Sequence, residues 1–190
     1  MPILGEECSI FPSNLLDDFI PDLPRCERGE EWRWWTIYAK SRQEKALARH
    51  LLAHEIPFYL PLVRTRQFVR GRRRCAYLPL FTGYVFMYGT EDQRVTTLTT
   101  NRISRILSVE TPGELLTDLR QVRDLIASDA PLTVESRLSA GAWVRVKRGV
   151  LRGLEGRILR RNGKTRLLIA VNYLQQGVSV EIDDFMVEPI

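Results

Sequence analysis

Few residues in this chain of 190 residues have the types and spacing that catalysis or metal binding needs. His50 and His54 are four positions apart, which would bring two imidazoles to one side of a helix, where such a pair can hold a metal ion. The stretch HLLAHE lacks the glutamate of a zinc protease, and no third ligand suggests itself. We therefore expect no metal and no cofactor. The chain also has no P-loop, GxGxxG or GxSxG pattern, which indicates that it is not an enzyme.

Cationic side chains are the more informative group. The run RGRRR, residues 70–74, lies between two strand-like segments and predicts the tip of a β-hairpin. Guanidinium groups at such a tip can reach phosphates without any movement of the sheet. A second cationic strip lies on and just before a predicted helix and consists of Lys40, Arg42, Lys45 and Arg49.

The charge of the chain is unevenly distributed. The 28 Lys and Arg and 23 Asp and Glu residues give a net charge of +5 and a sequence pI near 9.4. Residues 1–31 carry −6, 32–109 carry +10, 110–139 carry −3 and 140–190 carry +4. A basic block between two acidic stretches points to a polyanion or an acidic protein surface as partner. A merely solvated basic surface is the alternative.

The composition excludes two classes of protein. The chain is 44% hydrophobic and 27% charged, as ordinary globular proteins are, so it is not wholly disordered. It contains no apolar run of about 20 residues, so we exclude a membrane protein. The three cysteines, Cys8, Cys26 and Cys75, form no CxxC pair, and the first residues do not have the pattern of a signal peptide. We expect reduced thiols and a cytoplasmic location.

The first 31 residues are acidic and rich in proline, and they predict a mostly disordered tail. Its apolar residues could form a short helix that docks on a partner: Ile10, Phe11, Leu15, Leu16, Phe19 and Ile20. A tail of this charge could also lie over the basic block and screen it until a partner displaces it.

Residues 32–127 predict one domain of the α+β class, an antiparallel sheet covered by flanking helices. Ser41 is a suitable N-cap for the first helix, and Pro61 should interrupt the second strand. The expected strands are 34–39, 58–69, 75–80, 83–88 and 103–109, and the expected helices are 42–55, 91–100 and 113–127.

Residues 128–139 predict a linker, and residues 140–190 predict a second domain. Short alternating segments separated by glycines are typical of a small β-barrel. The five expected strands are 143–147, 155–160, 166–173, 178–182 and 186–187.

Two motifs resemble one family. The segment PLFTGYVFMY at 79–88, preceded by the VRGRRR hairpin and by WWTIYAKSRQEKALARHLL, closely resembles the N-terminal domain of NusG-type transcription elongation factors. The segment GAWVRVKRGVLRGLEGRILR at 141–160 is similar to the KOW motif of their small SH3-like C-terminal barrel. The KOW motif alone would be weak evidence, but both motifs in this order are specific for the family. Residues 34–88 look more like the specialised RfaH-type antiterminators than the housekeeping factor.

The resemblance implies a factor that binds RNA polymerase across its clamp, suppresses pausing and raises processivity. It implies that an apolar cavity grips the clamp helices of the largest polymerase subunit; the cavity residues are Tyr38, Phe81, Tyr84 and Phe86. It also implies that a polar helix contacts the opposite pincer through Gln93, Thr96 and Thr97. The implied face toward the non-template DNA of the transcription bubble consists of Lys40, Arg42, Lys45, Arg49, His50, Arg70, Arg72, Arg73, Arg74, Asn101 and Arg102. The KOW domain would bind a ribosomal protein or the termination factor Rho, and we expect a monomer.

The sequence departs from the family pattern at two places. Thr82 stands where the family often has proline, which frees a backbone N–H in that turn, and RVTTLTT is offset from the subgroup's pattern. The segments LLIAVNYL and VSVEI alternate like strands, so we expect a barrel and not the helical hairpin that the RfaH type can form. A ribosome-associated protein that holds ribosomal RNA through KOW is the alternative. A nuclease would need clustered acids or a metal site that the basic block lacks.

Overall fold

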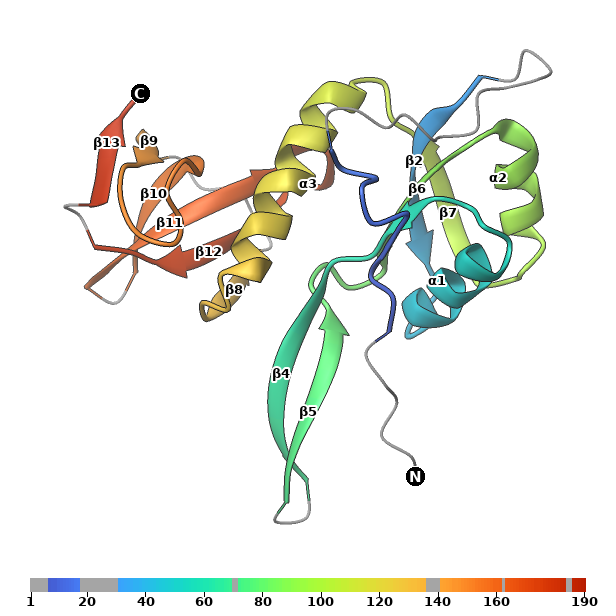
Figure 1. The fold of residues 1–190 in the computed structure, drawn as a ribbon, viewed down its shortest axis with the longest axis horizontal. Helices are drawn as coiled ribbons and strands as arrows, with labels where there is room; N and C mark the ends of the chain where they lie inside the picture. Colours follow the sequence, from blue (N-terminus) through green and yellow to red (C-terminus); the bar gives the residue numbers. More distant parts are fainter. Residues whose placement is uncertain (1–6, 18–30, 70–71, 136–140, 162, 184–185) are drawn as a thin grey trace. The chain divides into compact units, whose positions relative to one another are not determined.

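The computed structural model describes residues 7–17, 31–69, 72–135, 141–161, 163–183 and 186–190; the side chains of 66–69, 72–74 and 161 lie outside that description. The chain divides into two compact units, Met1–Pro112 and Gly113–Ile190 (Figure 1). Each unit is described by itself.

Unit 1 is built on a five-stranded antiparallel sheet. Two helices belong to it, α1 (Glu44–Ala53) and α2 (Glu91–Leu98). The expected α+β class, an antiparallel sheet with flanking helices, is confirmed. Across the sheet the strands follow the order β1 (Ile10–Phe11), β3 (Phe58–Tyr59), β6 (Tyr84–Gly89), β2 (Arg33–Ala39) and β7 (Ile103–Ser108).

The two faces of this sheet follow from the alternation of side chains along each strand. Trp35 and Met87 lie on the face that packs against α1 in the buried core. The helix α2 lies on the same face, because Thr97 Oγ1 contacts Met87 Sδ at 3.6 Å and Arg94 lies over the Trp35 ring. The opposite face is called the aromatic face below; its cross-strand neighbours include Trp34, Thr36, Tyr38, Tyr84, Phe86 and Leu107.

The first helix begins later than the sequence predicts. Gln43 occupies the N-cap position without a side-chain hydrogen bond, so the prediction that Ser41 caps a helix over 42–55 is wrong. The reason is a turn: Gln43 N donates to Lys40 O at 3.0 Å, and Arg42 has a φ of +60°, which a right-handed helix cannot contain.

The predicted hairpin is present, and the interruption at Pro61 is confirmed. The strands β4 (Leu62–Val69) and β5 (Arg72–Pro79) pair along their whole length. They form a separate two-stranded sheet and do not join the main one. Pro61 has no N–H to continue the ladder of β3 into β4. The base of the hairpin is anchored, since Leu62 is part of the core and Tyr77 packs against it.

The prediction of a mostly disordered tail is wrong for residues 7–17. Here β1 pairs with β3, with Ile10 opposite Tyr59. Leu15 and Leu16 are completely buried. The expected docking helix is absent from this segment, because Ile10 and Phe11 are extended; its other apolar residues, Phe19 and Ile20, lie outside the described residues.

Unit 2 contains a six-stranded antiparallel sheet. All five strands predicted for residues 140–190 are present, and the expected strands over 166–182 are confirmed. Their order is β13 (Val187–Pro189), β9 (Trp143–Val146), β10 (Glu155–Arg161), β11 (Lys164–Val171), β12 (Gln176–Glu181) and β8 (Leu132–Glu135), with a 3₁₀ turn η1 (Asn172–Leu174) after β11.

The expected domain borders differ from this arrangement at two places. The strand β8 lies inside the segment 128–139 expected as a linker, because Leu132–Glu135 pairs with β12. The helix α3 (Pro112–Ala127), expected at the end of the first domain, is almost wholly in unit 2. Its side chains accept backbone hydrogen bonds there, Asp118 from Asn172 N and Gln121 from Glu155 N, both at 2.9 Å.

In the ranges that the structure describes, no helix has the length and apolar character that a membrane crossing requires.

Candidate functional site

A pair of tyrosines marks one end of the aromatic face. Tyr38 on β2 and Tyr84 on β6 lie opposite each other, with ring centroids 5.2 Å apart. Gly83 lies against the Tyr38 ring: its φ is +86°, and a Cβ at this position would come within 2.7 Å of Tyr38 Cε2. Glycine is therefore required by both backbone and space. Because 46% of Tyr38 is exposed, the pair offers aromatic surface to a partner.

Exposure changes across the aromatic face. Leu107, on the edge strand β7, is 44% exposed, whereas its neighbour Thr36 is 2% exposed and Phe86 is completely buried. Phe81 is also buried, at 1%. Of the four aromatic residues expected in a docking cavity, Tyr38 and Tyr84 thus reach the surface, and the two phenylalanines lie in the interior.

The turn that carries these aromatic residues is held by a buried carboxylate. Gly83 N donates to Glu44 Oε1 at 2.8 Å, and Glu44, the first residue of α1, is only 5% exposed. Tyr84 N donates to Phe81 O at 3.1 Å, which closes the turn. The turn therefore forms with Thr82 in place of proline. A carboxylate at a helix N-terminus is also favoured by the helix dipole.

A cationic cluster, Lys40, Arg42, Asn101 and Arg102, is brought together where β2 ends and β7 begins. Lys40 Nζ donates to Asn101 Oδ1 at 2.6 Å, and Lys40 N donates to Arg102 O at 2.7 Å. Arg102 Nη1 donates to Gln43 Oε1 at 2.7 Å. Both side-chain partners are neutral amides, so the positive charges are not neutralised by these bonds. Phosphate oxygens are suitable ligands for such a cluster.

His50 lies beside this cluster. Its pKa is lowered by burial, then by His54 and then by Arg102, so the imidazole is neutral at pH 7. Its Nε2 is buried and has no hydrogen-bond partner among the residues described. The His50 and His54 rings are 4.1 Å apart, and His54 Nδ1 lies 2.9 Å from His50 O. Within the described ranges, no group of three histidines, cysteines or acids is placed to hold a metal ion.

The other expected DNA-facing residues are more scattered. Arg42 and Arg49 are exposed, and Arg49 Nε donates to Lys45 O at 3.2 Å on α1. Arg70 lies outside the described residues. The side chains of Arg72, Arg73 and Arg74 do too, although their backbone forms the start of β5.

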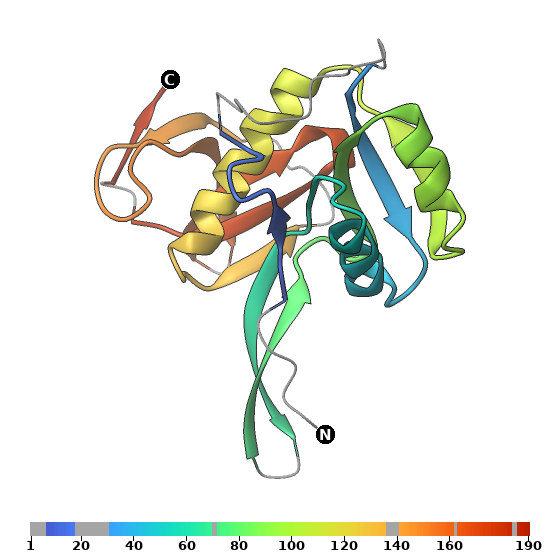
Figure 2. The same ribbon diagram turned by 45° about the vertical axis from the view of Figure 1, so that its right-hand side comes forward.

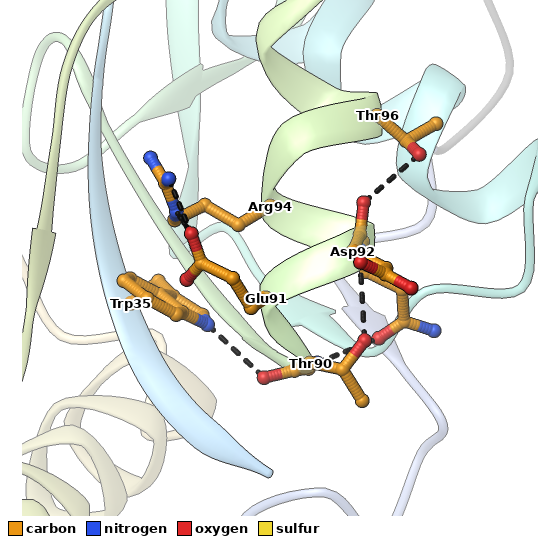
Figure 3. Close-up of polar contacts among 8 residues, drawn as sticks. Trp35, Thr90, Glu91, Asp92, Arg94 and Thr96 are labelled. Carbon is orange, nitrogen blue, oxygen red and sulfur yellow. Dashed lines mark hydrogen bonds and ion pairs between the residues drawn. The ribbon is translucent and has the colours of Figure 1, made fainter. Parts of the chain in front are cut away.

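The expected second contact surface on α2 is largely used to build the helix (Figure 3). Thr90 and Gln93 form a capping box, in which Thr90 N donates to Gln93 Oε1 at 3.0 Å. Thr97 is completely buried. Thr96 is exposed, and its hydroxyl donates to Asp92 O at 2.9 Å. Of the three expected residues, Thr96 is thus the one whose side chain faces solvent.

Sequence reasoning missed the exposed apolar residues of unit 1. Val95 and Leu98 on α2 are 49% and 41% exposed, Leu107 on β7 is 44% exposed, and Leu78 on β5 is 39% exposed. The helical spacing could have revealed the two residues on α2. Val95 and Leu98 are three positions apart and so share one side of α2, whereas the helix buries the side that carries Thr97. On a single sequence those residues are typical of a core.

Unit 2 has a surface pocket of about 520 Å³. Its wall is mostly apolar, with Arg148 and Arg166 as the cations; Arg166 is held by Thr133 and Ser179, at 2.8 and 2.9 Å. Val150, at its rim, is 86% exposed. The apolar lining includes Pro131, Val146, Leu151, Val180, Ile182 and Met186.

The contact between α3 and the C-terminal sheet contains one strongly perturbed acid. Burial raises the pKa of Asp118 to about 6, although its hydrogen bonds from Asn172 act in the opposite direction. Asp118 is 8% exposed. The protonation of this carboxyl therefore changes close to neutral pH.

The comparison with protein families is consistent with the sequence motifs. Residues 32–125 match the family model described as "Transcription termination factor nusG". A search of curated proteins found no match. Among solved structures, "Crystal Structure of MjSpt4:Spt5 complex conformation B" is similar at 13% identity and a TM-score of 0.24, over 83% of this chain and 96% of that chain.

Proposed function

Residues 32–125 make this chain a member of the NusG family, and on that premise we propose that it is an elongation and antitermination factor that acts by binding RNA polymerase and not by catalysis. The observation that carries the proposal is the exposed Tyr38–Tyr84 pair, which lies on the same sheet as the cationic cluster. An apolar surface beside a cationic one suits a protein that binds a polymerase and the nucleic acid within it.

The polymerase would dock on the exposed part of the aromatic face. Tyr38, Tyr84 and Leu107 supply aromatic and aliphatic area there, and the clamp helices of the largest subunit are the proposed ligand. Phe81 and Phe86 support this surface from below. Tyrosine is well suited to such a role because it buries a large ring and loses little conformational entropy.

The cationic cluster would contact non-template DNA in the bubble. Lys40, Arg42 and Arg102 can neutralise phosphates, and an arginine can also stack on an unpaired base. The neutral His50 would contribute shape and not charge. The arginines of the hairpin tip, Arg70 and Arg72 to Arg74, would extend this face.

Two further contacts complete the proposal. Thr96, with Val95 and Leu98 beside it on α2, would meet the opposite pincer, and bridging the cleft would keep the clamp closed and suppress pausing. The C-terminal sheet would bind a ribosomal protein or Rho. We propose that the chain works as a specialised RfaH-like factor in the cytoplasm, with its polymerase.

The proposal is tested by binding and by transcription. Leu107→Asp, alone and with Tyr38→Ala, should weaken binding to purified polymerase and abolish the reduction of pausing in an elongation assay. Val134→Asp is the matched control, because Val134 is also 44% exposed and also lies on an edge strand. Equal polymerase affinity for all of these chains would refute the proposed docking surface.

One observation favours a second function. Trp143 on the C-terminal sheet is 43% exposed, and the guanidinium of Arg157 lies 5.3 Å from its ring centroid. Such a pair can stack on a nucleotide. A KOW-containing protein that holds ribosomal RNA would use it, and would bind ribosomal RNA without affinity for polymerase.

A further inference from the structure

The N-terminal strap, residues 7–17, is an addition to the sheet of unit 1. It lies outside the family match, which begins at residue 32. Its strand β1 pairs with β3, and Leu60 N donates to Ser9 O at 2.7 Å. Without the strap, β3 would be the edge of the sheet, and both Phe58 and Tyr59 would lose a neighbouring strand.

The strap lies on the side of the sheet that carries the aromatic face. Figures 1 and 2 both show residues 12–17 on the side away from α1 and α2. In the sheet register, Ile10 is opposite Tyr59, which is opposite Phe86, so these three side chains form a row on the aromatic face. Tyr59 and Phe86 are 3% and 0% exposed.

The apolar anchor of the strap is strong in area but short in length. Leu15 and Leu16 are both completely buried. Burial of two leucine side chains removes apolar surface from water, so this pair is the main contribution to the attachment of the strap. The strand itself is only two residues long and forms few ladder bonds.

The strap carries one unsatisfied polar atom. Within the described residues, Glu7 Oε1 is buried without a hydrogen-bond partner. A buried polar group without a partner destabilises the state that buries it. Release of the strap would return Glu7 to water, which offsets part of the lost apolar burial.

We propose that the N-terminal strap is a displaceable cover of the aromatic face, which the polymerase must move aside to reach Tyr59 and Phe86. The inference rests on the proposed polymerase docking. In the free protein, Tyr38 and Leu107 on this face are about half exposed, whereas Tyr59 and Phe86 are buried. Displacement of the strap would extend the docking surface toward β3. The strap then lowers the apparent affinity of the chain for polymerase, because only the fraction of molecules with an uncovered face can bind through it.

Two variants test the cover, one of full length and one truncated. Leu15→Asp with Leu16→Asp keeps the chain length and removes the apolar anchor; a chain lacking residues 1–17 is the second variant. Ser13→Asp is the matched control, since Ser13 is exposed on the same strap. Hydrogen exchange of the Leu60 amide, which donates to Ser9 O, reports whether the strap has left. We expect fast exchange at Leu60 and about tenfold tighter polymerase binding in both variants, and neither change in the control.

The outcomes separate the cover from the docking itself. A variant with a fast Leu60 amide, a protected α1 and unchanged or weaker polymerase affinity overturns the inference. If no chain binds polymerase, the proposed function fails. The exposure of the aromatic face is then measured by the binding of an apolar fluorescent dye. The released strap should then raise dye binding above that of the Ser13→Asp control, and an unchanged signal overturns the cover as well.

Discussion

Gly83→Ala should destabilise unit 1 and displace Tyr38. The new Cβ would be 2.7 Å from Tyr38 Cε2, and the backbone would keep a φ of +86°. A non-glycine residue in this region costs about 1–2 kcal/mol. Tyr38 is exposed enough to rotate away, but it then loses its packing on Tyr84, which contributes about 0.5–1.5 kcal/mol. The sum is about 1.5–3.5 kcal/mol, or roughly 6 °C or more in the melting temperature of a domain of this size.

Gly153→Ala separates the two effects. Gly153 has a φ of +91°, and nothing lies within 4 Å of a Cβ added there, so its substitution measures backbone strain alone. Thermal unfolding is read from tryptophan fluorescence, because Trp32, Trp34 and Trp35 report on unit 1 and Trp143 reports on unit 2, where Gly153 lies. We expect a larger loss for Gly83→Ala than for Gly153→Ala, together with weaker polymerase binding. Equal losses would show that Tyr38 does not rest on Gly83, and the geometric argument would fail.

Three further predictions concern pH, DNA and the hairpin. The raised pKa of Asp118 means that the folded unit 2 binds a proton more tightly than the unfolded chain, so its stability should fall as pH rises from about 4 to about 6 and then level off. The shift of the pKa from 3.8 to about 6 corresponds to about 3 kcal/mol in the free energy of unfolding. Asp118→Asn, with neighbouring Glu114 kept, should remove this pH dependence when the free energy of unfolding is measured with urea. An unchanged pH dependence would contradict the raised pKa of Asp118. Lys40→Ala with Arg102→Ala should lower the salt dependence of bubble-DNA binding by about 0.7 per cation removed, while Arg160→Ala, an exposed arginine of unit 2, should leave it unchanged. Replacing Arg72, Arg73 and Arg74 by alanine should leave polymerase binding unchanged and weaken DNA binding. If the salt dependence of DNA binding is unaltered, these arginines do not contact DNA.

Local patterns were sufficient for most elements of the fold. The aromatic and β-branched run of β2 and the apolar runs of β11 and β12 predict strands because such residues pack well on a pleated sheet, and each of these strands has at least three consecutive buried residues. The hairpin and the stop at Pro61 follow from turn chemistry and the missing proline N–H. These features depend on residues close in sequence, which is why one sequence reveals them.

Long-range pairing could not be predicted in the same way. The acidic composition of residues 1–31 outweighed the apolar pair Leu15 and Leu16, and nothing local reveals that β1 finds its partner at Phe58 and Tyr59. For the same reason β8 lay inside an apparent linker, and the grouping of α3 with unit 2 could not be seen in the sequence. Hydrogen bonds over 54 positions, such as Asp118 to Asn172, leave no trace in spacing.

The candidate site was predictable by residue type and not by exposure. The two tyrosines pack on each other and Lys40 donates to Asn101, because these residues lie at the ends of predicted elements; their roles in binding stay predictions. Phe81, Phe86, Gln93 and Thr97 were chosen by the same pattern, yet their side chains are buried or used in a helix cap. Packing decides which member of an apolar set faces solvent.

The hairpin β4–β5 gives this protein an adjustable part. Its strands are eight residues each, which is about 26 Å of extended chain at about 3.3 Å per residue, and their sheet shares no ladder with the main one. Substitutions or length changes beyond its anchored base leave the core and the tyrosine pair untouched. Under the proposed function, exchange of the tip would redirect the factor to other nucleic acids while the proposed docking face stays constant.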